Sequence, residues 1–410
     1  MTTAVVVGGG VIGACCALEL RDAGIEHVTL LEAGGALGAQ TTAAGAGFAA
    51  YWAGALEATL ADYATGFYAR VQEQDGTDLG VRRRGLLLPA LSEAGEAVLR
   101  GLHEREHAFS DEVRWLEPAE ALALAPILAP GAVRGAVLQP QAHQVPTART
   151  MEALARRLPA AGVDVRLGAR VERVERSGDR VAGVRTADGL LAADVVVNAA
   201  GAWAHALAAR DGVSVGAVPL LESRFVTAPS PEVSDELPLL LLLERDVLYV
   251  RPEQGGLLVG AVERSVPAAS RPPLDAPPDV AELPDHAVAS HERLARESAD
   301  VLPLLGRLRP LARASGMPTF TPDGRHVLGE APDLRGYYVA AGCNESGVTH
   351  GPGLAHLLAE LVTTGTTRDD VSPYRVGRFA ELSDAELCDG AVATYLSRHV
   401  SQPTTDGGAR

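Results

Sequence analysis

A glycine-rich turn near the start of the chain carries the residues best suited to chemistry. Three valines, Val5–Val7, precede the run Gly8-Gly9-Gly10-Val11-Ile12-Gly13, and an apolar stretch follows it. The first glycine of such a run permits a tight turn off a strand, the third lets a phosphate approach, and the last allows close helix–sheet packing. The exposed N–H groups and the dipole of the following helix can then bind a pyrophosphate.

Glu32 follows about twenty residues after these glycines, at the end of a second strand pattern over 28–32. A carboxylate at this place can accept hydrogen bonds from both hydroxyls of an adenosine ribose. That favours a dinucleotide with an unphosphorylated ribose, FAD or NAD rather than NADP. The alternative is a glycine-rich turn of some other α/β fold, but the strand before, the helix after and the acid at this distance favour dinucleotide binding.

Composition and charge exclude several classes of protein. The net charge of −16 and the absence of basic runs argue against nucleic acid as a partner. No apolar run reaches the roughly 18 residues of a membrane span, and the first strand pattern starts too close to Met1 for a signal peptide, so we expect a cytoplasmic protein. Four cysteines without CxxC spacing indicate neither disulfides nor a metal site. The chain contains no lysine, which excludes Schiff-base and P-loop lysine chemistry.

A second glycine-rich turn lies near the other end of the chain. A buried strand pattern over 337–342 precedes it, and the run from Gly347 to Gly353 opens a helix that reaches about Thr364. A glycine turn between a core strand and a helix N-terminus again describes an anion-binding site. Another buried strand pattern, 193–203, ends in small residues that should border the same ligand. The ligand-binding domain is therefore predicted to be discontinuous.

These patterns predict an α/β fold with a Rossmann-like domain and a second α+β domain built on a mostly antiparallel sheet. We assign 1–50, 145–215 and 316–380 to the first domain, 51–144 and 216–315 to the second, and 381–410 to a C-terminal helix and flexible tail. Periodicity predicts helices at 54–74, 92–107, 117–124 and 147–158 and strands at 162–167, 169–174, 181–186, 239–243, 247–251 and 257–262. Six prolines between residues 265 and 284 predict a surface loop.

Several motifs resemble those of a known family. They are Thr321-Pro322-Asp323-Gly324, Gly329-Glu330-Ala331-Pro332, Gly342-Cys343-Asn344-Glu345-Ser346-Gly347, the stretch from Val195 to Trp203, and Tyr249-Val250-Arg251-Pro252. Over about residues 4–378 the sequence resembles the D-amino-acid oxidase superfamily of flavoproteins, above all its sarcosine and dimethylglycine dehydrogenase branch. We expect none of the folate-binding domains that mammalian members of that branch carry.

This resemblance implies FAD and the oxidation of a C–N bond in a secondary or N-methylated amine or an amino acid, by hydride transfer to flavin N5 and hydrolysis of the imine. Together with the glycine turns it predicts the following FAD-binding residues: Gly8, Gly10, Val11, Ile12, Gly13, Glu32, Ala33, Thr41, Thr42, Ala44, Gly45, Val171, Ala200, Gly201, Trp203, Gly342, Asn344, Ser346, Gly347, Val348 and Thr349.

Five positions depart from the family pattern, and one of them is the loop near Ala50, which lacks the arginine of monomeric sarcosine oxidase. Ala44 and Gly316 stand where relatives attach their flavin through histidine or cysteine, so we expect FAD to be noncovalent. Pro318 stands where glycine oxidase has the arginine that binds the substrate carboxylate. Leu258 stands at about the position of the lysine that promotes reaction with oxygen in monomeric sarcosine oxidase. Each departure removes an inference about the substrate or the electron acceptor, which we expect to be oxygen or an electron carrier.

The first candidates for catalysis and substrate contact are Arg224, Tyr249, Arg251 and His350. Tyr51, Trp52 and Glu222 are secondary candidates. Two residues apart on a strand, Tyr249 and Arg251 point to one face. The alternatives are interface salt bridges for the arginines, core packing for Trp52 and packing beside the flavin for His350. Alternative functions are a noncatalytic FAD-binding regulatory subunit, a glycine-oxidase-like enzyme that produces peroxide, and an NAD-dependent reductase, which would need a second glycine fingerprint.

Overall fold

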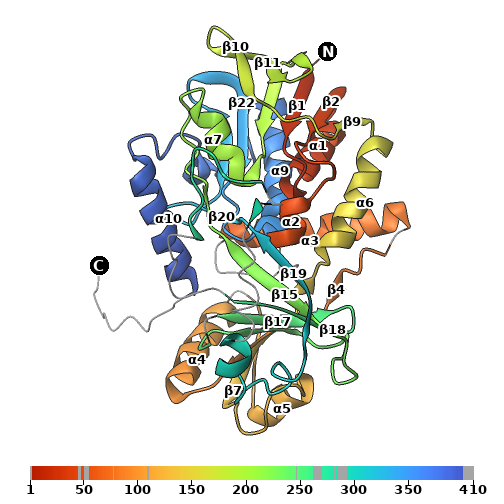
Figure 1. Ribbon diagram of the computed structural model, residues 1–410, viewed down its shortest axis with the longest axis vertical. Coiled ribbons are helices and arrows are strands. Elements are labelled where there is room, and N and C mark those ends of the chain that lie inside the picture. The colour runs from red at the N-terminus through yellow and green to blue at the C-terminus, as the bar shows by residue number, and fades with distance from the viewer. Residues whose placement is uncertain are drawn as a thin grey trace.

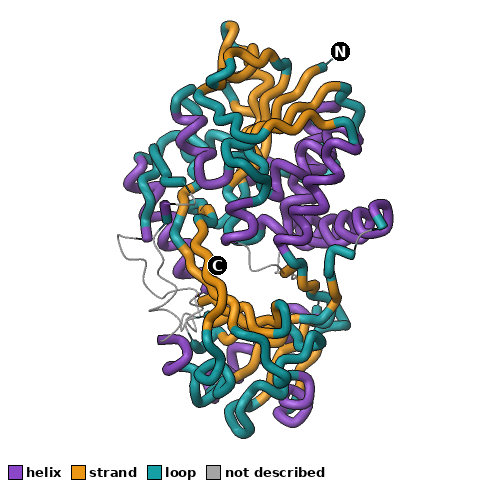
Figure 2. The backbone as a smooth tube through the Cα atoms, turned by 45° about the vertical axis from the view of Figure 1, so that its right-hand side comes forward, coloured by secondary structure: helices purple, strands orange, loops and turns teal. Residues whose placement is uncertain are grey.

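Two large sheets, one above the other in Figure 1, form the framework of the molecule. The computed structural model describes residues 2–44, 48–49, 55–76, 78–108, 110–245, 247–261, 270–279, 282–283 and 293–399. The predicted residues Gly45, Tyr51 and Trp52 and the tail from 400 onward lie outside this part. Figure 2 shows the strands of both sheets and most of the helices packed around the upper one.

The upper sheet has nine strands, and its centre is parallel. The order is β10-β11-β22-β13-β1-β2-β9, with β12 beside β11 and β21 antiparallel to β22. The strands are β1 Thr3–Val7, β2 His27–Leu31, β9 Val163–Arg166, β10 Arg173–Ser177, β11 Arg180–Thr186, β12 Gly189–Ala192, β13 Val195–Asn198, β21 Val327–Ala331 and β22 Leu334–Ala341. The first strand of the chain therefore pairs with β13, whose partner β22 lies near the end of the sequence.

Successive side chains of β1 point to opposite faces of this sheet, and both faces are covered. Ala4 and Val6 belong to a core with α1 Val11–Asp22, α3 Ala55–Asp75, α6 Thr147–Ala160 and α9 Gly347–Thr364. Val5 and Val7 belong to the core on the other face, to which α7 Ala204–Ala209 and α10 Asp384–His399 contribute. Such burial on both faces is typical of a doubly wound sheet and explains the continuous apolar strands in the sequence.

The lower sheet has eight strands in the order β19-β15-β18-β17-β16-β5-β7-β6. They are β5 Leu86–Ala90, β6 Arg114–Leu116, β7 Gly135–Gln139, β15 Glu222–Thr227, β16 Leu239–Leu242, β17 Leu248–Glu253, β18 Gly256–Ala261 and β19 Pro310–Gly316. All neighbours are antiparallel except β5 and β16. The predicted second sheet, mostly antiparallel, is confirmed.

Several smaller elements accompany the two sheets. They are α2 Ala39–Ala44, α4 Glu93–His107, α5 Pro118–Leu124, β3 Phe48–Ala49, β4 Arg82–Arg83, β8 His143–Gln144, β14 Val218–Pro219, β20 Thr319–Phe320 and the short 3-10 turns Gly201–Trp203 and Ser372–Tyr374. Helices α3, α4, α5 and α6 lie within two residues of their predicted positions. None of the helices in the described part is both long and apolar enough to cross a bilayer.

Two predicted strands differ from the structure. The pattern at 169–174 is a strand only from Arg173 onward, and Val171 lies in the preceding loop. The pattern at 193–203 ends as a strand at Asn198, because the side chain of this residue turns the chain. Its Nδ2 donates to the carbonyl of Ala204, and its Oδ1 accepts from the N–H of Ala200. The assignment of the sequence segments to two domains remains a prediction.

Candidate functional site

A cavity of about 840 Å³ lies beside the glycine turn at the carboxyl end of β1, and both glycine turns line it. Of the residues predicted from the sequence, the following line it: Gly8, Gly10, Val11, Ile12, Glu32, Ala33, Thr41, Val171, Ala200, Gly201, Trp203, Gly342, Gly347 and Val348. Residues from opposite ends of the chain thus meet at one site, at the edge of the parallel sheet where α/β folds bind ligands.

The first glycine turn is built from backbone contacts that exclude side chains. Gly8 has a φ of 105°, and a Cβ there would lie 2.5 Å from the carbonyl oxygen of Ala199. A Cβ on Gly13 would lie 1.9 Å from the carbonyl oxygen of Gly8. A Cβ on Gly10 would meet only the Thr41 hydroxyl within 4 Å, at 3.3 Å. The turn therefore packs tightly against the sheet and leaves space above Gly10, where a phosphate can approach the N-terminus of α1.

The carboxylate of Glu32 is held at the end of β2 by two backbone donors. Oε2 accepts from the N–H of Gly9 at 2.8 Å, and Oε1 accepts from the N–H of Gly34 at 2.7 Å. A carboxylate has about four lone-pair directions, so each oxygen can still accept a hydroxyl from the cavity. This arrangement fits the predicted contact with an adenosine ribose.

Hydrogen bonds of Asn344 hold the second glycine turn in place. Its N–H donates to the carbonyl of Thr319 at 2.7 Å, and its Oδ1 accepts from the N–H of Thr321 at 3.0 Å. Gly342, Asn344 and Glu345 have φ values of 64°, 45° and 63°, so three of four consecutive residues are left-handed. The Thr321-Pro322-Asp323-Gly324 motif therefore holds the loop that opens α9.

Several predicted FAD-binding residues do not line the cavity. They are Gly13, Thr42, Asn344, Ser346 and Thr349. Asn344, Ser346 and Thr349 are buried, which suits residues that support the loop. Ala44 ends α2, and Gly45 lies outside the described residues.

Comparison with known proteins identifies the family of this chain. The model of the family described as FAD dependent oxidoreductase matches residues 3–361. The chain belongs to the family of FAD-dependent oxidoreductases. It is 34% identical over 389 residues to 4-methylaminobutanoate oxidase (formaldehyde-forming) of Paenarthrobacter nicotinovorans, with 92% of this chain but only 45% of that protein covered. It is 30% identical to glycine oxidase of Geobacillus kaustophilus, with 91% and 96% covered.

A solved structure supports the same family membership. The crystal structure of glycine oxidase from Geobacillus kaustophilus has a TM-score of 0.79 and 27% sequence identity, covering 92% of this chain and 98% of that chain. This FAD-dependent oxidoreductase thus shares the fold of that enzyme over nearly its whole length. It spans about half the length of the first relative.

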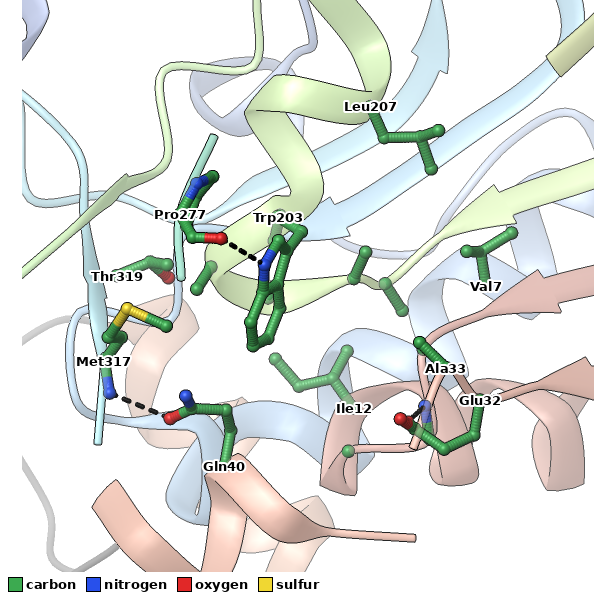
Figure 3. Close-up of a pocket in the computed structure, with 18 of the residues that line it drawn as sticks. Val7, Ile12, Glu32, Ala33, Gln40, Trp203, Leu207, Pro277, Met317 and Thr319 are labelled. Atoms are coloured by element: carbon green, nitrogen blue, oxygen red, sulfur yellow. Dashed lines mark hydrogen bonds between the residues drawn. The ribbon is translucent and has the colours of Figure 1, made fainter. Parts of the chain in front are cut away.

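The cavity fits FAD, because both glycine turns and Glu32 line it. Figure 3 shows Val7, Glu32 and Ala33 at one end, Gln40, Met317 and Thr319 at the other, and Trp203 between them. The Trp203 indole N–H donates to the carbonyl of Pro277 at 3.0 Å, so the proline-rich segment 270–279 covers one side. Asp279 accepts from Arg170 through both carboxylate oxygens, at 2.9 and 3.0 Å. The prediction of a surface loop here missed that it also forms a wall of the site.

The four candidate catalytic residues do not line this cavity. Arg224 and Tyr249 lie in one row across β15, β18 and β17, with Gly260 between them. A Cβ on Gly260 would lie 2.0 Å from the Tyr249 hydroxyl, so the phenol covers that glycine and extends toward Arg224. Arg251, 2% exposed, pairs with Glu253 at 2.5 Å.

His350 lies away from the cavity and within hydrogen-bond distance of a second buried histidine. The distance from its Nδ1 to Nε2 of His326 is 2.9 Å, and Nδ1 of His326 lies 3.1 Å from the carbonyl oxygen of Gly342. The donor and acceptor roles of the two rings depend on their tautomers. The structure therefore places His350 in the support of the second glycine turn, on α9, rather than among the residues that line the cavity.

A pair of carboxyl groups joins the cavity to the lower sheet. Glu345 lines the cavity, and its carboxyl is hydrogen bonded to that of Glu222 on β15. The other oxygen of Glu222, Oε1, is buried without a hydrogen-bond partner. Burial and the neighbouring Glu345 raise the pKa of Glu222 well above its ordinary value, so this carboxyl keeps its proton more readily than an exposed glutamate does. Glu222 is among the residues predicted from the sequence, whereas no pattern in the sequence indicates Glu345 as its partner.

We predict that Glu32→Ala weakens FAD binding at least about tenfold. Charge-assisted hydrogen bonds contribute roughly 1.5–3 kcal/mol each, and about 1.4 kcal/mol corresponds to a tenfold change in affinity. FAD fluorescence on serial dilution of the holoprotein measures the dissociation constant. Glu26→Ala removes an exposed carboxylate at the opposite end of β2 and serves as the control. Wild-type affinity in Glu32→Ala would show that this carboxylate does not hold the ribose.

We also predict that Glu222→Gln removes part of the pH dependence of stability. A raised pKa means that the native state keeps a proton that the unfolded chain loses above about pH 4.3. The wild type therefore loses stability as pH rises from there toward the raised pKa, by at most about 1.4 kcal/mol per pH unit for one proton. The other charged or titratable groups around Glu222, namely Glu345, Cys343, Arg224 and Tyr249, remain in the variant.

The measurement is the thermal midpoint of both proteins between pH 5 and 8, with Glu232→Gln, an exposed partner of Arg307, as the control. The wild-type midpoint should fall relative to that of Glu222→Gln as pH rises. Parallel curves for the two proteins would contradict the raised pKa.

Proposed function

We propose that this FAD-dependent oxidoreductase oxidises a C–N bond in a secondary or N-methylated amine or an amino acid. The observation that carries the proposal is the meeting of both glycine turns at one cavity that a carboxyl pair connects to the lower sheet. FAD supplies a two-electron acceptor for the hydride lost from the carbon beside the substrate nitrogen, which leaves an imine that water hydrolyses. Two relatives, named 4-methylaminobutanoate oxidase and glycine oxidase, support this class of substrate.

The chain's own residues would bind and orient the substrate between the cavity and the lower sheet. Glu345 lies at that junction, and the carboxyl oxygens of Glu345 and Glu222 can accept N–H groups of an amine. Arg224 and Tyr249 on the same sheet face provide donors for an anionic group. Arg224 is only 8% exposed, and exclusion of water strengthens such contacts. A substrate with both an amine and a carboxylate suits this set.

We propose further that FAD is held without a covalent bond. Gly316, which stands in place of an attaching cysteine, ends β19 beside Met317 at the cavity. A glycine offers no nucleophile, and neither does Ala44. Contacts from the glycine turns, Glu32 and the wall formed by residues 275–279 would then supply the affinity.

The central prediction is that an amine reduces the bound flavin in the absence of oxygen. Purified protein should show a flavin spectrum, and acid precipitation should leave the yellow colour in the supernatant. Anaerobic addition of 4-methylaminobutanoate, sarcosine, dimethylglycine or glycine should bleach the absorbance, and butanoate, which lacks nitrogen, serves as the control. If dithionite bleaches the flavin but no amine of a broad panel does, the result would favour the noncatalytic regulatory alternative.

We expect reduced enzyme to react slowly with oxygen and quickly with a phenazine or quinone. A fixed cation near the flavin would stabilise the charge that develops on oxygen. Leu258 stands where the resembled oxidase has its lysine, is 3% exposed, and pairs in register with Arg251, whose charge Glu253 offsets. Stopped-flow mixing with oxygenated buffer measures the rate, which Leu258→Lys should raise at least about tenfold and Leu258→Met should not. Wild-type reoxidation much faster than that of free flavin would show a true oxidase.

A further inference from the structure

Gln40 bridges the first glycine turn and the end of the lower sheet. It lies in α2, which is anchored to the turn by the bond from the N–H of Gly38 to the carbonyl of Gly9 at 2.9 Å. Its neighbour Thr41 accepts the N–H of Val11 at 3.0 Å. On the other side, Oε1 of Gln40 accepts the N–H of Met317 at 2.8 Å, just beyond β19. The backbone of Gln40 is therefore held by the contacts of α2, and its amide oxygen is held by Met317. The side chain also lines the cavity.

The contact with Met317 settles which way the amide points. A backbone N–H can only donate, so the atom facing it must be the amide oxygen, and the NH₂ group must take the other direction. That nitrogen, Nε2, is buried, and within the described part of the chain it has no hydrogen-bond partner. A buried donor without an acceptor costs free energy, which a ligand with an acceptor in the cavity can recover.

The position of Gln40 in the cavity indicates which ligand supplies the acceptor. Glu32 lies at one end, where the adenosine ribose is expected, and Gln40 lies at the other (Figure 3). A dinucleotide that starts at Glu32 and passes the N-terminus of α1 therefore extends its flavin half toward Gln40. We propose that the Gln40 amide donates a hydrogen bond to an oxygen or nitrogen acceptor in the flavin half of FAD. This role does not depend on which substrate the enzyme oxidises.

Two substitutions separate this donor from the bridge to Met317. Gln40→Glu keeps an oxygen that accepts the N–H of Met317 but replaces the donor with a second acceptor. Gln40→Met, of similar length, removes both. FAD release from the holoprotein is followed by flavin fluorescence on serial dilution, and the visible spectrum of the bound flavin is recorded. Both variants should raise the FAD dissociation constant about tenfold or more, which corresponds to about 1.4 kcal/mol.

The matched control is Gln72→Glu. Gln72 also accepts a backbone N–H through its side-chain oxygen, from Leu79 at 3.1 Å, but it does not line the cavity. The Gln72→Glu substitution should leave FAD affinity unchanged. Gln40→Ala, which also removes both contacts, replaces Gln40→Met if that variant fails to fold, as judged by circular dichroism.

Three results would overturn the proposal. Wild-type affinity and spectrum in Gln40→Glu would show that the donor is not used. Weak binding in Gln40→Met but not in Gln40→Glu would assign Gln40 to the bridge alone. Unchanged FAD affinity with weaker binding of butanoate, titrated by its effect on the flavin spectrum, would place the acceptor on the substrate instead of on FAD.

Discussion

Backbone contact between the first glycine turn and the end of β13 is the constraint on which the rest of the site depends. Gly8 lies so close to Ala199, and Gly13 so close to Gly8, that no side chain fits at either position. This contact brings the N-terminus of α1 to the edge of the sheet, beside the carboxyl ends of the central strands. The charge and dipole effects expected there act only because the backbone can approach so closely. The glycines are therefore a packing requirement first and a binding feature as a consequence.

The second turn reaches the same place by a different kind of contact. Hydrogen bonds hold this turn in place. Asn344 is hydrogen bonded to Thr319 and Thr321, so the loop before α9 keeps its left-handed residues. Helices α1 and α9 then pack together, and a Cβ on Gly351 would already lie 3.1 Å from Ile12. The two helix N-termini are thus held side by side at one site, although the sequence separates them by most of the chain.

Sequence patterns predicted much of this because the relevant signals are local. The glycine spacing, the acid at the end of β2 and the apolar strands of the parallel sheet all express periodicity or turn chemistry within one segment. His350 shows the limit, since its position after a glycine turn fits a place near the flavin, whereas its hydrogen bond to His326 depends on a residue just before β21, 24 positions earlier in the chain. Glu345 and Gln40 lacked any such signal. Their importance comes from partners on β15 and beyond β19, and no spacing rule connects those segments.

The polar groups around the cavity differ in what they require from a ligand. Glu32 is already satisfied by two backbone donors and can accept further bonds without reorganising. Gln40 Nε2 and Glu222 Oε1 are buried and lack partners in the described part of the chain, so each carries a cost that a ligand can relieve. The Glu222 carboxyl is also hydrogen bonded to Glu345, and an N–H group of an amine can reduce the repulsion that the two carboxyls would have if both were charged. The end of the cavity opposite Glu32 is therefore the part of the site where binding has most to gain, and it is there that the cavity meets the lower sheet.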